Sequence, residues 1–458
     1  MRTYVLPLRH AAALIACAVL VISGVPSAVR AQHDHTSVTI NFWQPLGDPL
    51  ARSLLVPYLQ QFEKSHPGIT VNFVVVSGDN NYVKYTTAMA AGRGPDVIMT
   101  TSFNPPVPEW AANGFIQPLD PWFNQLHVSR EQWLPWVWDM QTFHGHTWGF
   151  MQQYDSYIFV WNKQLFKQAG LDPNRPPRTL AELDAYARKL TKFDANGKLV
   201  QAGFVPWVWP QSSYHPQFWP ALFGGQLFDS TRNVYTLNSP AAIKALTWLG
   251  TYAKMLGGPQ SVNGLMGQFQ GNNDPFYTGQ VAMAITGEWA PAFIPMFAPK
   301  FKYGVNYGAA APPTAPGVPY GTNYTNGGDT FVMPVGTKHP QEAVEFMLYM
   351  MGHDPLMAWC MGEANIPPTK PTIFDPRYLK AAPASVSLVA TARLAIANPQ
   401  ILRVVSTSAI NDYAVTAFEE AQQEVLYGRA SAKAALDKAQ QVVAQREASF
   451  QHSNPGWH

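Results

Sequence analysis

The chain has 458 residues, of which 47% are hydrophobic and 13% are charged. That length exceeds what one compact core commonly supports, and it predicts two or three domains. The formal net charge is only +2, with 31 basic and 29 acidic side chains, which argues against nucleic acid or an anionic surface as a partner.

The first residues have the pattern of a secretory signal peptide. Arg2 and Arg9 precede an apolar run over residues 11–22, and small residues around Ala31 offer a cleavage site. The run is shorter than the roughly 20 apolar residues of a membrane-spanning helix. We therefore predict a signal peptide over residues 1–31 and an extracytoplasmic location, in the periplasm or on the outer face of the cell membrane.

The two cysteines bear on anchoring and on stability. Leu14-Ile15-Ala16-Cys17 resembles the lipobox at which bacterial lipoproteins are cut and lipidated, so lipid anchoring at Cys17 is an alternative. The apolar run continues past that cysteine, however, which favours cleavage after Ala31. Only Cys360 then remains, and the mature chain forms no internal disulfide.

The low content of charged residues suggests a habitat. A typical soluble protein has about 25% charged residues, compared with 13% in this chain. A weakly charged surface suits an acidic exterior, where carboxylates lose their charge and their pairing. We hold this as a hypothesis about the environment in which the protein works.

The mature chain begins with alternating strands and helices. Residues 38–42 alternate apolar and polar side chains as a half-buried strand does. Asp48 and Pro49 are typical of the N-cap and first position of a helix, although Pro57 is expected to kink it. Further strands are predicted over residues 69–76 and 96–100, with a helix around residues 82–91 between them. This order is typical of an α/β sheet with crossover connections.

The same alternation returns later in the chain. A strand is predicted over residues 157–161, and Thr179 with Glu182 forms a capping box that begins a helix. Further helices are predicted from Pro340, around residues 418–425, and around residues 436–443. Residues 257–335 are rich in glycine, proline and aromatic side chains, which predicts loops and short strands.

A series of short motifs in a fixed order is more specific. The motifs are INFW (40–43), FEKSHPGITV (62–71), AGRGPDV (91–97), WAANGFIQPL (110–119), FHGHTWG (143–149), VWNKQLF (160–166), GQVAM (279–283), GEWA (287–290), GG (327–328) and IPP (366–368). In this order they resemble the family 1 extracellular solute-binding proteins, the maltose-binding-protein-like substrate-binding components of bacterial ABC importers. The resemblance covers nearly the whole mature chain.

The resemblance implies a fold and a way of working. The fold is the periplasmic-binding-protein fold, with two α/β lobes joined by a multi-strand hinge and a ligand cleft between them. On this basis residues 32–152 and 308–352 form the N-terminal lobe, and residues 153–307 and 353–458 form the C-terminal lobe. The chain would cross between lobes near residues 152–155, 306–309 and 351–354. The resemblance also implies a monomer that closes on a small ligand, needs no cofactor, and is recognised by ABC transporter permease subunits.

Candidate ligand-binding residues follow from the chemistry of a sugar, which needs aromatic platforms for its faces and polar side chains for its hydroxyls. Trp289 is the stacking candidate, since the motif that it ends resembles a segment of the family at the cleft, and Glu288 precedes it. Trp43 follows the first strand, where α/β ligand sites gather, and either lines the cleft or packs between the lobes. Asp48 ends the loop after Trp43, which the family often uses for contacts.

The remaining candidates come from other strand ends, the first crossing and two loops: Ser102, Phe103, Asn104, Tyr154, Asp155, Trp207, Trp209, Gly327, Gly328 and Asp329. Asp155 would accept hydrogen bonds from ligand hydroxyls or stabilise the hinge. Trp207 and Trp209 belong to the cleft or to the core. Gly327 and Gly328 would let backbone N–H groups approach the ligand.

Other functions find less support in the sequence. The pairs His33 with His35 and His144 with His146 lack the further ligands of a metal site, and the second pair is expected in a hairpin turn. No phosphate-binding Gly-x-x-x-x-Gly-Lys motif and no Gly-x-Ser-x-Gly elbow occurs. A secreted glycoside hydrolase with two catalytic carboxylates remains a rival. A binding protein for a glycerol phosphate, phosphodiester or polyol is another, but the candidate loops hold few basic groups, so a neutral carbohydrate is favoured.

Overall fold

The computed structural model describes residues 37–78, 81–103, 106–208, 217–266, 274–381, 401–455 and 457. The predicted signal peptide (1–31), Cys17 and the site candidates Asn104 and Trp209 lie outside these residues. Ser37–His458 forms a unit of its own by its internal contacts. Within the described part, every helix is too short or too polar to cross a bilayer.

The first sheet has the strand order β2-β1-β3-β15-β6. Its parallel part consists of β1 (Val38–Gln44), β2 (Ile69–Val75) and β3 (Val97–Thr100), joined by α1 (Pro49–Ser65) and α2 (Asn81–Ala90). β15 (Thr330–Val332) pairs antiparallel with β3 and with β6 (Phe150–Met151). The strands and helices predicted for residues 38–100 are therefore confirmed.

Local chemistry explains where α1 begins and which face it buries. The carboxylate of Asp48 accepts hydrogen bonds from the N–H groups of Leu50 (2.9 Å) and Ala51 (3.0 Å), as an N-cap does. Pro49 follows at a position where its missing N–H is no loss. The helix continues through Pro57, which lies on the exposed face, while Leu55, Leu59 and Phe62 are buried.

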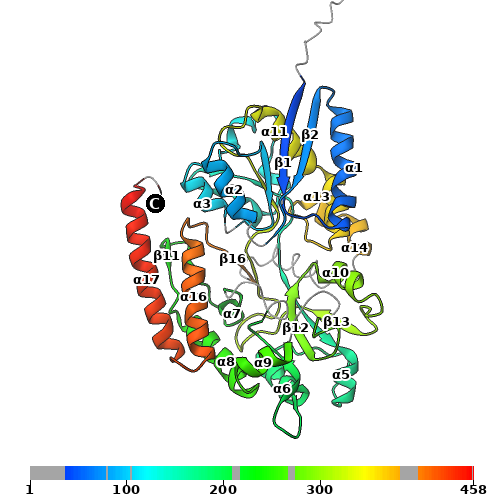
Figure 1. Ribbon diagram of the computed structural model, residues 1–458, viewed down its shortest axis with the longest axis vertical. Coiled ribbons are helices and arrows are strands. Elements are labelled where there is room, and N and C mark those ends of the chain that lie inside the picture. Colours follow the sequence, from blue (N-terminus) through cyan, green and yellow to red (C-terminus); the bar gives the residue numbers. More distant parts are fainter. Residues whose placement is uncertain are drawn as a thin grey trace, which may run out of the picture. The chain divides into compact units, whose positions relative to one another are not determined.

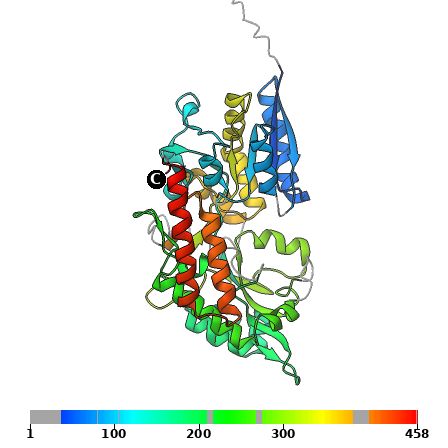
Figure 2. The same ribbon diagram turned by 60° about the vertical axis from the view of Figure 1, so that its left-hand side comes forward.

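The second sheet has the order β13-β7-β12-β9-β8. These strands are β7 (Tyr157–Asn162), β8 (Lys192–Phe193), β9 (Leu199–Phe204), β12 (Val281–Gly287) and β13 (Tyr307–Ala310). Helix α6 (Leu180–Leu190) packs on β9, and the Thr179 hydroxyl caps it by accepting from the N–H of Glu182. Two long helices, α16 (Asn411–Leu426) and α17 (Ala432–Ser453), lie side by side and pack on α8 (Pro240–Met255) (Figures 1 and 2).

The other elements are shorter. They are α3 (Val107–Ala112), η1 (Asp120–Trp122), η2 (Arg130–Gln132), α4 (Pro135–Gln141), β4 (Thr142–Phe143), β5 (His146–Thr147), α5 (Lys163–Gln168), α7 (Phe218–Leu222), β10 (Phe228–Asp229), β11 (Val234–Tyr235), α9 (Pro259–Met266), α10 (Ala290–Phe297), β14 (Asn323–Thr325), α11 (Pro340–Met350), α12 (His353–Gly362), α13 (Lys370–Ile373), α14 (Pro376–Ala381) and β16 (Leu402–Val404). The two sheets with their helices are two α/β lobes, which we call the first and the second lobe, so the predicted fold class is confirmed.

Two of the predicted crossings differ from the observed contacts. β13 pairs with β7, so residues 308–310 belong to the second lobe rather than the first. α12 packs on α1, where a Cβ added at Gly362 would lie 2.5 Å from Leu54, and Figure 1 shows α13 and α14 beside α1. The crossing predicted near residues 351–354 is therefore wrong, since the chain stays with the first lobe through α14. The other lobe boundaries stay a prediction.

Residues 257–335 contain the predicted short strands β13, β14 and β15, but also the longer strand β12 and the helices α9 and α10. β12 occupies the middle of the second sheet, between β7 and β9, and its residues are almost all buried. A strand that is covered on both faces carries a continuous apolar run instead of an alternating one, and small residues such as Ala282 and Ala284 lower its contrast with a loop. Composition averaged over this region hides such a strand.

Gly203 offers a test of the packing between β9 and α6. A Cβ at this position would lie 2.1 Å from the carbonyl oxygen of Ala187 and 2.6 Å from its Cα, which are rigid backbone atoms of α6. We expect Gly203→Ala to lower the free energy of unfolding by about 2 kcal/mol or more, measured by urea denaturation. Gly264→Ala is the matched control, because its Cβ meets nothing within 4 Å. That variant should be neutral or stabilised by up to about 1 kcal/mol, and equal behaviour of the two would contradict the packing argument.

Candidate functional site

Four buried carboxyl groups gather where the chain passes between the lobes. Asp155 lies between β6 and β7, Glu288 follows β12, Asp329 precedes β15, and Glu363 follows α12. Their exposed fractions are 7%, 0%, 4% and 3% respectively. Electrostatic interactions link Asp155 to Asp329 and Glu288, and link Glu363 to Asp329. We call these four residues the carboxyl cluster.

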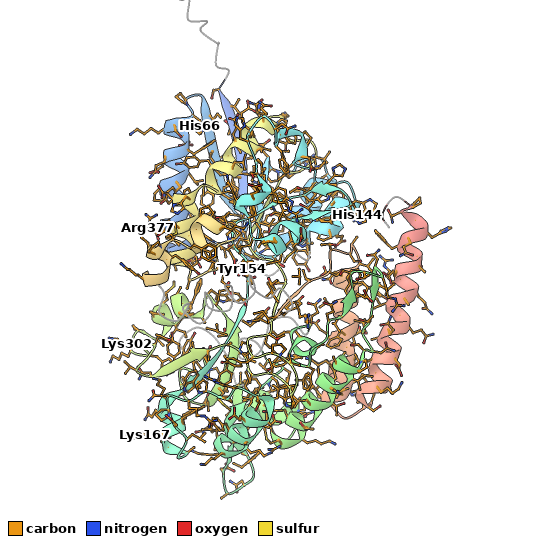
Figure 3. All side chains as sticks on the ribbon, turned by 180° about the vertical axis from the view of Figure 1, so that it is seen from behind. His66, His144, Tyr154, Lys167, Lys302 and Arg377 are labelled. Carbon is orange, nitrogen blue, oxygen red and sulfur yellow. The ribbon has the colours of Figure 1, made fainter. Side chains whose placement is uncertain are left out.

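Main-chain hydrogen bonds hold the segments of the cluster in place. The N–H of Gln152 donates to the carbonyl of Asp329 and the N–H of Asp155 donates to that of Gly327, both at 2.6 Å. Two hydrogen bonds join Ser156 and Glu288. The N–H of Glu288 donates to the carbonyl of Ser156 at 3.2 Å, and the N–H of Ser156 donates to Oε2 of Glu288 at 2.8 Å. Figure 3 shows Tyr154, within the first of these segments, at the junction of the two lobes.

Side chains connect the cluster further, yet leave several polar atoms without a partner. Nε2 of Gln153 donates to Oδ1 of Asp155 at 2.9 Å, and Nε1 of Trp359 donates to Oδ2 of Asp329 at 3.2 Å. The buried atoms without a hydrogen-bond partner in the described part of the chain include five near the cluster: Glu288 Oε1, Glu363 Oε1, Gln153 Oε1, Gln152 Oε1 and Gln152 Nε2. Four of these five atoms are oxygens, which accept hydrogen bonds when the carboxyl groups are ionised. Unpaired buried groups of this kind cost about 1–3 kcal/mol each.

Burial raises the pKa of every carboxyl group in the cluster, and repulsion by a neighbouring carboxyl group adds to this effect for Asp155, Glu288 and Glu363. Burial, opposed by the hydrogen bonds from Gln153 and Trp359, raises the pKa of Asp329 to about 7. Burial and the nearby Asp329 raise the pKa of Glu363 to about 8. The pKa values of Asp155 and Glu288 are raised well above their usual range, first by burial. The nearby Asp329 raises that of Asp155 further, and Asp155 and Asp329 raise that of Glu288. In the described part of the chain, no Lys or Arg forms an ion pair with any of the four.

Trp289 presents an aromatic surface beside the cluster. Its ring lies over Gly287, where an added Cβ would be 2.3 Å from the indole carbons, so only glycine at that position permits this conformation. The side chain is half-buried and makes no ring contact with another described aromatic residue. One side of the indole is thus fixed on the backbone, next to Glu288.

Other predicted aromatic residues pack within a lobe. Trp43 is half-buried with its ring 6.4 Å from that of Tyr85. Phe103 is fully buried with its edge toward Phe143 at 6.1 Å. Tyr154 is 1% exposed and lies edge-on to Trp136 at 6.0 Å. Trp207 is half-buried against the core, and its indole N–H has no partner among the described residues.

The glycine turn before β15 serves close packing of the backbone. Gly327 has φ 93°, and a Cβ there would lie 2.3 Å from the Cβ of Phe103. A Cβ at Gly328 would lie 2.3 Å from the carbonyl oxygen of Gln153. The N–H of Gly327 donates to the hydroxyl of Thr325 at 3.1 Å. The prediction that this N–H is directed at a ligand is therefore wrong.

Ser102 and Asp48 lie next to the cluster through intermediates. The hydroxyl of Ser102 accepts a hydrogen bond from Nδ2 of Asn326 at 3.0 Å, directly before the glycine turn. Asp48 caps α1 and raises the pKa of Glu363 by its charge, after the larger effect of burial. Both therefore border the candidate site rather than forming its centre.

The sequence did not reveal every residue of the site. Gln152 and Gln153 adjoin the predicted Tyr154, but a glutamine carries no motif of its own. Glu363 follows a helix, and nothing local distinguishes it from a solvated helix end. Its burial results from the packing of α12 on α1, a contact between distant parts of the chain.

No group of three or more His, Cys, Asp and Glu side chains in the described segments is arranged to hold a metal ion. His144 and Gly145 form the turn of the hairpin β4–β5, with φ values of 51° and 76°, as predicted for a hairpin. The pair His33 and His35 lies outside the described residues.

Comparison with known proteins assigns the family. Residues 47–355 match the model of the bacterial extracellular solute-binding protein family. Since this match covers more than half of the chain, the protein belongs to that family of extracellular solute-binding proteins, and the predicted resemblance is confirmed.

Individual relatives and solved structures are similar to this chain at 24–29% sequence identity. The structure is similar to that of CpMnBP1 with mannobiose bound, with a TM-score of 0.76, 29% identity, and coverage of 88% of this chain and 99% of that one. A binding protein of Brucella abortus is 27% identical over 69% of this chain and 73% of the relative. The sn-glycerol-3-phosphate-binding periplasmic protein UgpB of Escherichia coli is 24% identical over 65% of each chain.

The raised pKa values predict how stability depends on pH. A carboxyl group whose pKa is higher in the folded chain binds its proton more tightly there, so the free energy of unfolding falls as pH rises through the folded value. For Asp329 and Glu363 this window extends from about pH 4 to about pH 8. We expect the thermal midpoint of the ligand-free protein to fall by at least about 2 °C over this range.

The double variant Asp329→Asn, Glu363→Gln should flatten this pH dependence, because neither replacement titrates. Glu131→Gln removes an exposed carboxylate and is the matched control. Scanning calorimetry at several pH values measures the effect. A pH dependence that stays as steep in the double variant as in the control would show that the cluster does not cause it.

Proposed function

We propose that the protein captures a neutral mono- or oligosaccharide by closing its lobes and delivers it to the permease of a bacterial ABC transporter. The observation that carries this proposal is Trp289, whose indole is fixed over Gly287 beside the carboxyl cluster. A flat apolar ring next to hydrogen-bonding groups matches a sugar, which has apolar C–H faces and hydroxyl edges.

The unpaired polar atoms of the site support a ligand rich in donors. Carboxylate and amide oxygens predominate among them, and sugar hydroxyls donate to such acceptors. Hydrogen bonds to a carboxylate are stronger than those between neutral groups. The hydroxyls of a bound sugar would therefore supply hydrogen bonds to Glu288, Glu363 and Gln153 while the closed lobes exclude water.

The same atoms argue against an anionic ligand. A phosphate needs Arg or Lys, yet the cluster has no ion pair with either type of residue among the described residues. A negatively charged ligand would also oppose ionisation of the buried carboxyl groups, whose pKa values burial and neighbouring carboxyl groups already raise. The similarity to a glycerol-3-phosphate-binding protein therefore does not favour that ligand here.

The structural relatives suggest which sugars to test first. CpMnBP1 was determined with mannobiose and with mannotriose, at 29% and 30% identity to this chain. We therefore infer that a di- or trisaccharide containing mannose is the first candidate for this protein.

Transport rather than hydrolysis fits the positions of the acids. Glu288 uses Oε2 to hold the N–H of Ser156, and Asp155 accepts from Gln153, so both hold the segments that connect the lobes. We propose that they bind and do not catalyse. The signal peptide, the membrane permease as partner and a monomeric state complete the proposal.

Calorimetric titration with mannobiose, mannotriose, maltose, glycerol 3-phosphate and a polyol tests the ligand class. We expect heat of binding from at least one saccharide and none from glycerol 3-phosphate. Chromatography of the same samples should return the saccharide intact. Heat from the phosphate or polyol alone would refute the carbohydrate proposal, and a shortened saccharide would support a hydrolase.

Trp289→Ala tests the stacking role. Loss of the indole should weaken binding of the identified saccharide by about tenfold or more, which corresponds to about 1.4 kcal/mol. Trp122→Ala removes another half-buried tryptophan, in η1 of the first lobe, and should leave the affinity unchanged. Equal affinities of both variants and the unaltered protein would exclude Trp289 from the site.

A further inference from the structure

Helix α17 is firmly attached to the second lobe. Gln440 accepts from the N–H of Leu237 at 2.6 Å and donates to the carbonyl of Tyr235 at 2.9 Å. Asp437 accepts from Nδ2 of Asn238 at 2.9 Å. The helix also packs along α16 and α8, so its position follows that of the second lobe.

Trp457, shortly after the end of this helix, contacts the first lobe. The ring of Trp457 lies 4.5 Å from that of His144, 5.9 Å from that of Trp148 and 6.2 Å from that of Phe143. These partners belong to the hairpin β4–β5 and the residue after it. Figure 3 shows His144 beside the end of α17. We call Phe143, His144, Trp148 and Trp457 the aromatic clamp.

The hairpin is fixed to the first lobe. The carbonyl of Thr147 accepts from the N–H of Leu119 at 2.8 Å, and the N–H of Thr147 donates to the Asp120 carboxylate at 3.1 Å. The indole N–H of Trp148 donates to the carbonyl of Phe143 at 3.0 Å. The clamp thus joins a rigid hairpin of one lobe to a helix of the other.

An electrostatic interaction also connects α17 with helix α3 of the first lobe. Burial raises the pKa of Glu109 in α3, and the positive charge of Arg446 in α17 opposes that effect. α3 belongs to the first lobe, so Arg446 of α17 adds an electrostatic interaction with that lobe to the ring contacts of Trp457.

The clamp is also connected to the candidate ligand site. The edge of Phe103 meets Phe143 at 6.1 Å, and Phe103 lies directly under Gly327. The carbonyl of Gly327 accepts the N–H of Asp155. A short series of packed residues therefore leads from Trp457 to the carboxyl cluster.

We propose that Trp457 is a strap, which ties the second lobe to the hairpin of the first and restricts the angle between the lobes. Any rotation of the lobes about their connecting segments must move Trp457 relative to the hairpin, because each is rigidly attached to a different lobe. Without the strap, more lobe arrangements compete with the one that binds ligand, and the apparent affinity falls in proportion. This last consequence rests on the proposed function.

Distance measurements test the strap without a ligand. Spin labels at Asn113 of the first lobe and Lys167 of the second, both exposed, report the lobe separation by pulsed electron resonance after replacement of each by cysteine. Cys360 is fully buried and should not react. We expect Trp457→Ala to broaden the distance distribution, whereas Trp457→Phe, which keeps a ring, stays close to the unaltered protein.

Tyr427→Ala is the matched control, because Tyr427 is an exposed aromatic residue that directly follows α16, before the start of α17, and Arg429 lies over its ring. In calorimetry, Trp457→Ala should bind the identified saccharide at least threefold more weakly, and Tyr427→Ala should not differ from the unaltered protein. Identical distance distributions of the two alanine variants would overturn the strap. Failure of every saccharide to bind would refute the proposed function alone, since the distance measurement does not need a ligand.

Discussion

The burial of carboxyl groups at the passage between the lobes is the constraint on which the site depends. Asp155, Glu288 and Asp329 are almost completely buried without an opposite charge among the described residues. Such burial is costly, and the surrounding main-chain hydrogen bonds between the passing segments must compensate for it. A chain selected for stability alone would place apolar residues there. The acids at this position therefore indicate function, because residues that weaken a fold persist where binding requires them.

The close approach of the backbone makes this burial possible. Gly327 and Gly328 leave no room for a Cβ above Phe103 and Gln153, so the segments before β7 and before β15 lie in direct contact. That contact lets Gln153, which also donates to Asp155 in its own segment, form a hydrogen bond with Asp329. Gly287 has the same role for Trp289. The glycines thus act on the ligand site indirectly, by setting the positions of neighbouring side chains.

Local signals in the sequence predicted the elements well, and long-range packing explains the failures. Asp48, Pro49 and Thr179 are capping residues whose effect depends on the adjacent turn only, and α1 and α6 begin where they predict. Glu363 was missed because its burial depends on contact between α12 and α1. Phe103 has the same sequence signature as a ligand-binding residue, yet it is fully buried in the first lobe. Periodicity shows that a side chain is buried, but it does not show what covers it.

A single cause links the ligand, its charge and the response to pH. Because the cluster consists mainly of acceptors, it suits a ligand that donates hydrogen bonds and repels one that carries a negative charge. Burial of the cluster raises the pKa values of Asp329 to about 7 and of Glu363 to about 8, so protons are held there in the ligand-free protein. An acidic exterior, which the low content of charged residues suggested, would supply those protons. Stability in acid and recognition of a neutral polyhydroxylated ligand would then have the same structural origin.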